Sequence, residues 1–416
     1  MIEIKEEQER VILFGVSGGD NDEMEASLDE LEELVKTAGA QTLAKVIQNL
    51  ESPVPATYLG KGKIEELREL AKRLEATGVV CDDELSPIQL RNLEQALEIK
   101  VMDRTLVILD IFAARATSSE GKIQVELAQL KYRAARLVGL GSSLSRLGGG
   151  IGTRGPGETK LEVDRRRIHE RISHLKAELE QVKRHRKTNR KQRDQNHIPV
   201  LAIVGYTNAG KSTLLNTLTG AEILAEDKLF ATLDPTTRAW ELDRGERVLL
   251  TDTVGFINKL PHHLIEAFKS TLEEAKYADM ILHVVDSTSP MFASQMHVVY
   301  ETLRELGVEN KPVITLFNKM DRREKNGFLR DFKADYTLEI SAKTGEGVER
   351  LRHLLTELLR QRKVYVECVY SYGEAGKIQA IRRYGQLLEE QYTDAGIAVK
   401  GYIPREMLGR LEPEEK

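Results

Sequence analysis

The chain has 416 residues, of which 41% are hydrophobic and 31% are charged, with a formal net charge of −5. This length exceeds one ordinary hydrophobic core, so about two to four domains are expected, and the small net charge excludes a uniformly basic nucleic-acid-binding protein. Cys81 and Cys368 are the only cysteines, which excludes a disulfide framework or a cysteine zinc site. There is no secretory signal and no apolar run of about 18 residues, so we expect a cytoplasmic protein without a membrane span.

Residues 1–116 predict an N-terminal α/β domain. Apolar runs that are typical of buried strands occupy 10–16, 77–83 and 99–112. Apolar residues at helical spacing occupy 27–38 and 63–77. This alternation favours a small domain with a largely parallel sheet. Within it, Asp103 and Arg104 are either a functional pair or a structural ion pair at a strand end.

Residues 117–196 predict an antiparallel helical hairpin. Two seams share a spacing of four and three residues: Ile123, Leu127, Leu130, Ala134 and Leu137, then Ile168, Ile172, Leu175, Leu179 and Val182. Such matched seams predict two helices packed like a short coiled coil. Thr159 followed by Glu162 is a capping-box pattern that predicts the start of the second helix. The glycine-rich loop at 139–157 then forms the tip of the hairpin.

The hairpin is strongly basic. Residues 131–193 contain 18 lysine or arginine residues against 6 acidic ones, and the run 183–193 contains seven basic residues and no acidic one. Such asymmetry indicates a polyanionic partner. A solvated helix face followed by a charged linker is the alternative interpretation.

The segment after residue 199 predicts a phosphate-binding P-loop. The apolar run 200–204 leads into Gly205-x-x-x-x-Gly210-Lys211-Ser212, and a helical pattern follows. This strand–loop–helix order is the context that the motif requires, because backbone N–H groups and the helix N-terminus bind the phosphates. Lys211 is expected to reach the β- and γ-phosphates, and the Ser212 hydroxyl is expected to coordinate Mg²⁺.

Two further segments have tasks at the metal and the γ-phosphate. Asp252 ends an apolar strand, where it can orient Mg²⁺ through a water molecule, and Gly255 can donate its backbone N–H to the γ-phosphate. The threonine-rich segment 229–238 is typical of a switch loop, in which one threonine closes over the metal. Phe256 occupies the position of the expected water-orienting glutamine, so hydrolysis is expected to be slow until a partner orders the switch loops.

Asn318-Lys319-x-Asp321 predicts selectivity for guanine. Asp321 can accept hydrogen bonds from N1–H and the 2-amino group of guanine, whereas adenine would leave this carboxylate unpaired. Asn318 is expected at the N7/O6 edge of the base, and the Lys319 stem over its plane. Ser341-Ala342-Lys343 is expected to contact O6 through the backbone. Five motifs in this order predict a GTPase domain at 197–362.

The most specific motifs outside this domain are TYLGKGK (57–63), VMDRTLVILDIFAARA (101–116) and LGGGIGTRGPGETKLEVDRRRI (147–168). With FATLD and DTVGF they make the chain resemble the HflX family, in the Obg–HflX group of translation-factor-related GTPases. The resemblance implies a Mg²⁺-dependent GTPase that binds the large (50S) ribosomal subunit and splits stalled or stressed 70S ribosomes, with the GTP state controlling affinity. A hydrophobic residue at position 256 is characteristic of the family. The alternative function is an RNA-binding ribosome-assembly module in which GTP is mainly a structural latch.

The resemblance also implies a set of site residues. GTP contacts are expected at Gly205, Tyr206, Thr207, Asn208, Ala209, Gly210, Lys211, Ser212, Phe230, Ala231, Thr232, Leu233, Asp234, Asp252, Thr253, Val254, Gly255, Asn318, Lys319, Met320, Asp321, Ser341, Ala342 and Lys343. Mg²⁺ is expected on Ser212 and Thr232, with Asp252 acting through water. The expected catalytic residues are Lys211, Ser212, Thr232 and Gly255. From the residues alone, Thr236 and Thr237 remain alternatives to Thr232.

The glycine-rich loop is expected to contact rRNA near the peptidyl-transferase region. The residues concerned are Gly148, Gly149, Gly150, Gly152, Arg154, Gly155 and Gly157. The spacing Gly150-x-Gly152-x-x-Gly155 also matches a dinucleotide-binding loop, but no apolar strand leads into it. A thin backbone with little side-chain bulk instead suits a narrow RNA channel.

Residues 363–416 predict a small C-terminal α+β domain with strands at 364–370 and 396–404 and a helix between them. The complete chain is thus expected to be an α/β multidomain protein. Trp240 is expected to pack inside the GTPase domain, and His262 and His263 to lie on the surface. No feature demands an oligomer or a DNA partner, so a monomer is expected.

Overall fold

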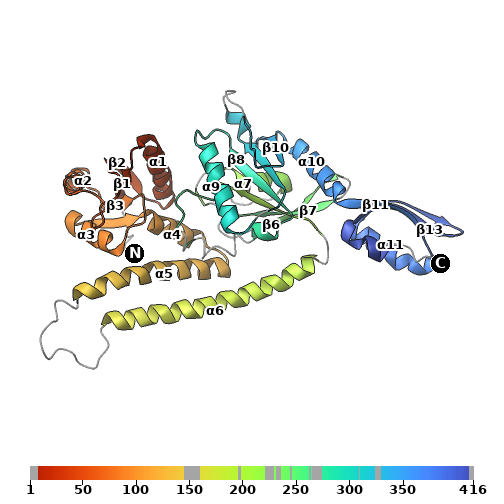
Figure 1. Ribbon diagram of the computed structural model, residues 1–416, viewed down its shortest axis with the longest axis horizontal. Coiled ribbons are helices and arrows are strands. Elements are labelled where there is room, and N and C mark those ends of the chain that lie inside the picture. Colours follow the sequence, from red (N-terminus) through yellow and green to blue (C-terminus); the bar gives the residue numbers. More distant parts are fainter. Residues whose placement is uncertain are drawn as a thin grey trace, which may run out of the picture.

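The computed structural model describes residues 8–144, 160–194, 198–220, 229–230, 236–243, 246–261, 264, 274–308, 310–323 and 329–411. Along the chain, a four-stranded sheet, a long helical hairpin, a six-stranded sheet and a three-stranded sheet follow one another (Figure 1). This arrangement confirms an α/β multidomain protein. None of the described helices is long and apolar enough to cross a membrane.

The N-terminal sheet is entirely parallel, as predicted. Its strands are β1 (Arg10–Ser17), β2 (Gln41–Asn49), β3 (Gly78–Cys81) and β4 (Lys100–Asp103), in the order β2-β1-β3-β4. Its helices are α1 (Asn21–Thr37), α2 (Lys61–Leu74), α3 (Pro87–Leu97) and α4 (Arg104–Arg115). Alternate residues of β1 face opposite sides: Ile12 lies in the cluster with α2 and α3, and Leu13 in the cluster with α1 and α4.

The prediction of one strand over 99–112 is wrong in its second half. Helix α4 begins at Arg104 because the Asp103 carboxylate accepts a hydrogen bond from the backbone N–H of Leu106 at 2.9 Å and so caps the helix. The buried residues of α4 are Arg104, Thr105, Val107, Ile108, Leu109, Ile111 and Phe112. The sequence of a helix that is buried on most sides is a nearly continuous apolar run, and a buried strand has the same pattern. Strand β2 and helix α3 lie outside the predicted elements.

The predicted hairpin is formed by α5 (Ser119–Leu144) and α6 (Lys160–Asp194), which run side by side and antiparallel (Figure 1). Their seam is the predicted one: Ile123, Leu127, Ile172, Leu175 and Leu179 form one buried cluster, with Leu130, Ala134 and Ile168 packed against it. At the edge of the seam, Arg171 Nε and Nη2 donate to the two carboxylate oxygens of Glu126 at 2.7 and 2.9 Å. Helix α5 continues to Leu144, so the prediction that the glycine-rich loop begins at residue 139 is wrong. The glycine-rich residues 148–157 and Thr159 lie outside the described residues.

The six-stranded sheet comprises β5 (Val200–Gly205), β6 (Thr236–Glu241), β7 (Arg247–Asp252), β8 (Met280–Asp286), β9 (Val313–Asn318) and β10 (Tyr336–Glu339). The order is β10-β9-β8-β5-β7-β6, and only β6 is antiparallel to its neighbour. Helices α7 (Lys211–Thr219) and α10 (Val348–Gln361) share a core on one face, and α9 (Phe292–Glu305) packs on the other. Trp240 is buried in the first of these cores, as predicted.

The last sheet has the antiparallel order β11-β13-β12, with β11 (Lys363–Tyr370), β12 (Gln386–Thr393) and β13 (Gly396–Pro404). Helix α11 (Ala375–Tyr384) packs on one face, and the short α12 (Leu408–Leu411) follows. Within the described part of the chain, 3-10 turns include η2 (Met320–Arg322), η3 (Tyr372–Glu374) and η4 (Arg405–Met407). The α+β class is confirmed, although β12 was not predicted.

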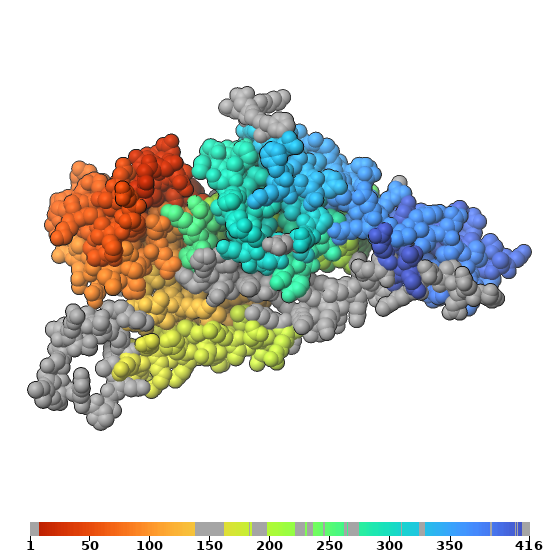
Figure 2. All heavy atoms as spheres, in the orientation of Figure 1, coloured from red at the N-terminus to blue at the C-terminus, as the bar shows by residue number. Residues whose placement is uncertain are grey.

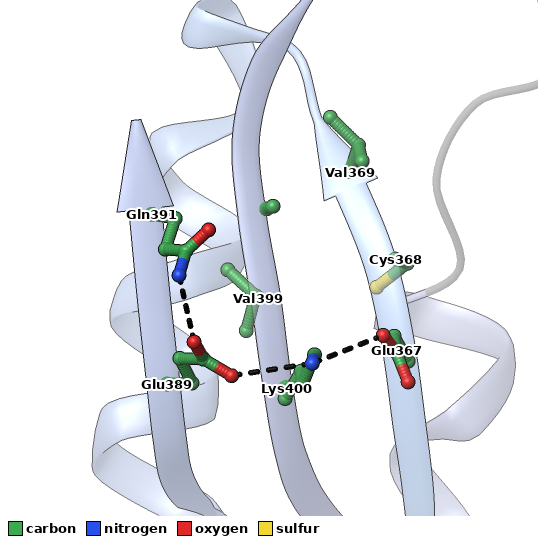
Figure 3. A pocket seen from close by; sticks show the side chains of 8 residues that line it. Glu367, Cys368, Val369, Glu389, Gln391, Val399 and Lys400 are labelled. Atoms are coloured by element: carbon green, nitrogen blue, oxygen red, sulfur yellow. Dashed lines mark hydrogen bonds and ion pairs between the residues drawn. The ribbon is translucent and has the colours of Figure 1, made fainter. Parts of the chain in front are cut away.

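The open face of this last sheet carries a recess (Figure 3). Lys400 lies there between Glu367 and Glu389, with Nζ–O distances of 3.4 and 3.2 Å. Because its charged groups bind one another across the strands, the recess is a structural feature of the sheet, and it is not formed by any of the predicted nucleotide-binding motifs.

Candidate nucleotide-binding site

The P-loop lies between the end of β5 at Gly205 and the start of α7 at Lys211. Gly210 has φ +97°, and a Cβ atom there would lie 2.3 Å from Nδ2 of Asn318, so only glycine fits. The turn directs the N-terminal end of α7 toward the edge where β5, β7 and β9 end, which is where an anion is favoured.

Lys211 is buried beneath this loop, and its Nζ donates to the carbonyl oxygen of Tyr206 at 2.8 Å. Burial lowers the pKa of Lys211 to about 8, and the carboxylate of Asp252 opposes this shift. A lysine whose charged form is disfavoured by burial gains from an adjacent anion. The side chain is therefore suited to binding phosphate.

The hydroxyl of Ser212 and the carboxylate of Asp252 meet at the start of α7 and the end of β7. Ser212 Oγ donates to Asp252 Oδ2 at 2.8 Å. The structure describes no group of three or more His, Cys, Asp or Glu side chains that could hold a metal ion within its described residues. Two oxygen donors fit Mg²⁺, which is commonly held by one or two protein groups together with phosphate oxygens and water.

The segment after Asp252 is hydrogen-bonded to the P-loop. The backbone N–H of Thr207 donates to the carbonyl oxygen of Phe256 at 2.7 Å, and Phe256 N–H donates to that of Gly205 at 3.1 Å. A Cβ atom on Gly255 would lie 2.8 Å from Cγ2 of Thr207 and 3.0 Å from Nζ of Lys211, so the position requires glycine. The Phe256 ring is buried in the core, where it has no means of orienting water.

Asn318 links two loops of the site. Its Nδ2 donates to the carbonyl oxygen of Ala209 at 2.8 Å, and its Oδ1 accepts from the backbone N–H of Ala342 at 2.8 Å. Both ends of the amide thus hold the P-loop beside residues 341–343. The predicted contact of Asn318 with the N7/O6 edge of guanine stays a prediction.

The predicted base-binding carboxylate lies next to this link. Asp321 Oδ1 accepts a hydrogen bond from Ser341 Oγ at 2.7 Å, and this bond lowers the pKa of Asp321. The carboxylate is therefore ionised at neutral pH and suited to accept hydrogen bonds. Lys319 has a left-handed backbone (φ +64°), and its Nζ lies 2.7 Å from Oδ2 of Asp286.

The structure places some predicted residues elsewhere. Phe230 is buried against Phe112 of α4, with ring centroids 4.7 Å apart. The hydroxyl of Thr237 lies 2.9 Å from that of Thr251 within the β6–β7 pair. The residues Ala231, Thr232, Leu233, Asp234, His262 and His263 lie outside the described part of the chain.

Asp103 and Arg104 do not pair with each other, so both interpretations of them as a pair are wrong. Asp103 accepts hydrogen bonds from Tyr132 at 2.9 Å and from Arg136 at 2.5 Å, which joins α5 to the N-terminal sheet. Arg104 instead binds Asp82 at 2.7 Å. Successive residues at the start of a helix point in different directions, which separates the two side chains.

Sequence reasoning missed a group of N-terminal residues that contact the P-loop side of the GTPase domain. Glu30 accepts a hydrogen bond from the hydroxyl of Tyr206, and Asp82 and Asp83 bind Lys259. The available signal was the pair Asp82-Asp83 at the end of the predicted strand 77–83, since the carboxyl end of a parallel strand is a typical place for a binding site.

The fold and this arrangement of loops define a P-loop GTP-binding protein. Three consecutive family descriptions match the chain: "GTP-binding GTPase N-terminal" at 25–113, "GTP-binding GTPase Middle Region" at 115–193 and "50S ribosome-binding GTPase" at 200–319. Full-length relatives agree, and the chain belongs to the HflX family of GTPases. It is accordingly a GTP hydrolase.

The similarity to these relatives extends over nearly the whole chain. GTPase HflX of Lacrimispora saccharolytica is 68% identical over 99% of this chain and 97% of its own length. GTPase HflX of Caldanaerobacter subterraneus subsp. tengcongensis is 50% identical over 99% of this chain and 95% of its own length. GTPase HflX of Escherichia coli is 43% identical over 84% of this chain and 83% of its own length.

Proposed function

We propose that this GTPase binds GTP and Mg²⁺ at residues 205–212, 231–234, 252–255, 318–321 and 341–343. We further propose that its GTP-bound form binds the large ribosomal subunit and splits stalled or stressed 70S ribosomes. In this account the chain comprises an N-terminal domain (1–116), a hairpin (117–196), a GTPase domain (197–362) and a C-terminal domain (363–416), and it acts as a monomer in the cytoplasm.

The contacts of the P-loop region support the proposal of GTP and Mg²⁺ binding. Ser212 and Thr232 would hold Mg²⁺, with Asp252 acting through a water molecule, and the bound ion would neutralise charge on the phosphates. The Lys211 ammonium would stabilise the negative charge that develops on phosphate oxygens, and Gly255 N–H would donate to the γ-phosphate. Phosphoryl transfer to water depends mainly on such positioning and charge stabilisation.

The absence of a polar side chain at position 256 supports a slow basal rate. The Phe256 ring is buried in the core, and its backbone hydrogen-bonds to Gly205 and Thr207 of the P-loop. Orientation of the attacking water would then depend on the switch segment 229–238 and on groups that a partner contributes. The ribosome would be that partner.

The observation that carries the ribosome proposal is the outward face of α6. While Ile172, Leu175 and Leu179 are buried against α5, basic side chains are exposed along the same helix. These exposed side chains are Arg165, Arg166, Arg167, Lys176 and Arg184. Helix α6 lies along the edge of the molecule (Figure 2), so this face is accessible to a polyanion. The match of 200–319 to a 50S ribosome-binding GTPase family supports the same partner.

Co-sedimentation with purified 50S subunits tests the proposal. The chain should pellet with 50S in the presence of Mg²⁺ and a non-hydrolysable GTP analogue, and much less with GDP. A triple variant, Arg165→Gln, Arg166→Gln and Arg167→Gln, should bind more weakly and show a smaller salt dependence, since each lost phosphate contact lowers the slope of log affinity against log salt by about 1.

A matched control removes the same charge elsewhere. Lys36, Arg247 and Arg304 are exposed, with side-chain exposures of 73%, 67% and 65%, and lie outside the hairpin. Changing all three to Gln should leave subunit binding within about twofold of the unchanged chain, because only contacts with phosphate alter the slope. Equal losses in the two triple variants would show that net charge, rather than α6, determines binding.

A further inference from the structure

The N-terminal domain contacts three loops of the GTPase domain at once. Its contacts reach Tyr206 in the P-loop, Phe230 in the segment 229–238 and Lys259 just after Asp252-x-x-Gly255. A single hydrophobic cluster includes Phe112 of α4 together with other residues from both domains. The two domains therefore share a packed interface at the loops that are expected to respond to the γ-phosphate.

Lys259 is held at this interface by two carboxylates. Its Nζ binds Asp82, and it lies 2.7 Å from Oδ1 of Asp83, at the carboxyl end of β3. Its backbone is left-handed, with φ +54°, a conformation that non-glycine residues rarely adopt. Such a conformation persists where surrounding contacts determine it. The surrounding contacts of Lys259 are the two ion pairs of Nζ and a hydrogen bond from its backbone N–H to Asn258 Oδ1 at 3.0 Å.

The charges at this point balance closely. Asp82 is fully buried and also accepts hydrogen bonds from Arg104 at 2.7 Å and from Ser27 Oγ at 2.8 Å. Asp83 accepts from the hydroxyl of Tyr58. Burial alone would lower the pKa of Lys259, but the adjacent carboxylates raise it, so the ammonium is charged at neutral pH. Removing Lys259 would leave buried negative charge with less compensation.

Tyr206 adds a second link between the same elements. Its hydroxyl donates to the carboxylate of Glu30 on α1 and accepts from the backbone N–H of Asn258 at 2.6 Å. Glu30 in turn binds Arg104. One hydroxyl thus joins the P-loop, the N-terminal domain and the residue that precedes Lys259.

We propose that Lys259 is a positioning residue for GTP hydrolysis, which anchors the segment after Asp252-x-x-Gly255 on Asp82 and Asp83 of the N-terminal domain. Because Gly255 lies against Thr207 and Lys211, a displacement of this segment moves the predicted γ-phosphate contact. The N-terminal domain then helps to order the loops that position the attacking water, a task that the apolar side chain of Phe256 does not perform. A partner that shifts this domain changes the affinity of the site for the γ-phosphate, and by linkage the γ-phosphate changes the strength of the interdomain contact.

The proposal rests on GTP hydrolysis and is independent of ribosome splitting, so it is tested on the full chain without ribosomes. Lys259→Asn removes the charge while keeping a residue that tolerates the left-handed backbone. The expected result is a decrease of about tenfold in single-turnover kcat, since small misplacements cost up to about 10²-fold. Affinity for a non-hydrolysable GTP analogue should fall relative to GDP, whose affinity stays within about twofold because no γ-phosphate contact is involved.

Two further variants separate positioning from general structural damage. Lys259→Arg keeps the charge and should retain most of the rate. Asp83→Asn keeps a hydrogen-bond acceptor for Tyr58 and should also lower the hydrolysis rate. Combining it with Lys259→Asn should cause no further loss, because the effects of mutations within one network are not additive. Lys36→Asn, at an exposed lysine on α1 of the N-terminal domain, is the control and should have no effect.

The outcomes decide the proposal. An unchanged rate in Lys259→Asn, or equal losses of GDP and GTP-analogue affinity, would overturn it, and so would additive effects of Lys259→Asn and Asp83→Asn. Loss of hydrolysis in the unchanged chain itself would instead count against the GTPase site. Failure of ribosome binding with normal hydrolysis would leave the role of Lys259 intact and contradict only the ribosome proposal.

Discussion

The Ser212 hydroxyl donates a hydrogen bond of 2.8 Å to the Asp252 carboxylate and so joins the first turn of α7 to the end of β7. The two residues come from separate motifs, 40 positions apart. Their contact places both oxygen donors near Lys211 and Gly255, and the Mg²⁺ dependence that we propose for this GTPase can be tested there.

Asp252→Asn should abolish most of the Mg²⁺-dependent activity. An amide is a weaker partner for a hydrated divalent cation than a carboxylate, so kcat should fall by about 10²-fold, a typical loss when a group that stabilises developing charge is removed. GDP affinity measured without Mg²⁺ should change little. A variant that hydrolyses GTP at the original rate would exclude Asp252 from the metal site.

Nucleotide affinity should depend on pH above about pH 8. Burial lowers the pKa of Lys211 to about 8, and bound phosphates favour its charged form. Below this pH the lysine is already charged, so the group adds no pH dependence. As the pH rises above it, binding must take up a proton, and affinity should fall by up to about tenfold per pH unit.

Calorimetric titrations with GDP at pH 7, 8 and 9, each in two buffers of different ionisation enthalpy, measure this uptake directly. Affinity that stays constant from pH 7 to 9, with no buffer-dependent heat, would show that Lys211 does not change its protonation when phosphate binds.

Base selectivity should follow the carboxylate of Asp321. Asp321→Asn replaces an acceptor of two hydrogen bonds by a group that is both donor and acceptor, so GDP affinity should fall by at least about 100-fold, given the strength of hydrogen bonds to charged groups. Xanthosine diphosphate, which has a carbonyl oxygen in place of the 2-amino group, should bind the variant better than GDP. Competition with a fluorescent nucleotide measures both affinities. Unchanged preference for guanine would refute the assignment.

The seam between α5 and α6 should be a separate source of stability. Leu175 is 1% exposed, and Leu175→Ala should lower the free energy of unfolding by about 2–5 kcal/mol if the hairpin unfolds cooperatively with its neighbours. Lys176→Ala, at the adjacent exposed position, should change it by less than about 0.5 kcal/mol. Denaturant unfolding followed by circular dichroism compares the two, and similar losses would show that the seam does not contribute as described.

Local patterns made the nucleotide-binding loops predictable. The P-loop, Asp252 and Asn318 each lie at the carboxyl end of an apolar strand, and a parallel sheet brings such ends to one edge whatever the rest of the fold does. The hairpin was predictable for a similar reason, because its two seams have the same period and pack against each other. These features depend on short stretches of sequence.

Elements and contacts that depend on packing against other parts of the fold were not predictable from local sequence patterns. Helix α4 is buried on most sides, so its sequence lacks the polar stripe that distinguishes a helix from a strand. Strand β2 is a partly exposed edge strand with a mixed sequence. The contact of Lys259 with Asp82 joins residues 177 positions apart, and it exists only because two domains pack together. Sequence pattern carries no information about that packing.

The most direct test of the account is sucrose-gradient sedimentation of purified 70S ribosomes incubated with the full chain, Mg²⁺ and either a non-hydrolysable GTP analogue, GTP or GDP. The account predicts that the analogue and GTP convert 70S particles into 50S and 30S subunits, with the chain in the 50S fraction, and that GDP does not. Binding of the chain to intact 70S particles without dissociation in any nucleotide would contradict it and favour an RNA-binding module in which GTP is a structural latch.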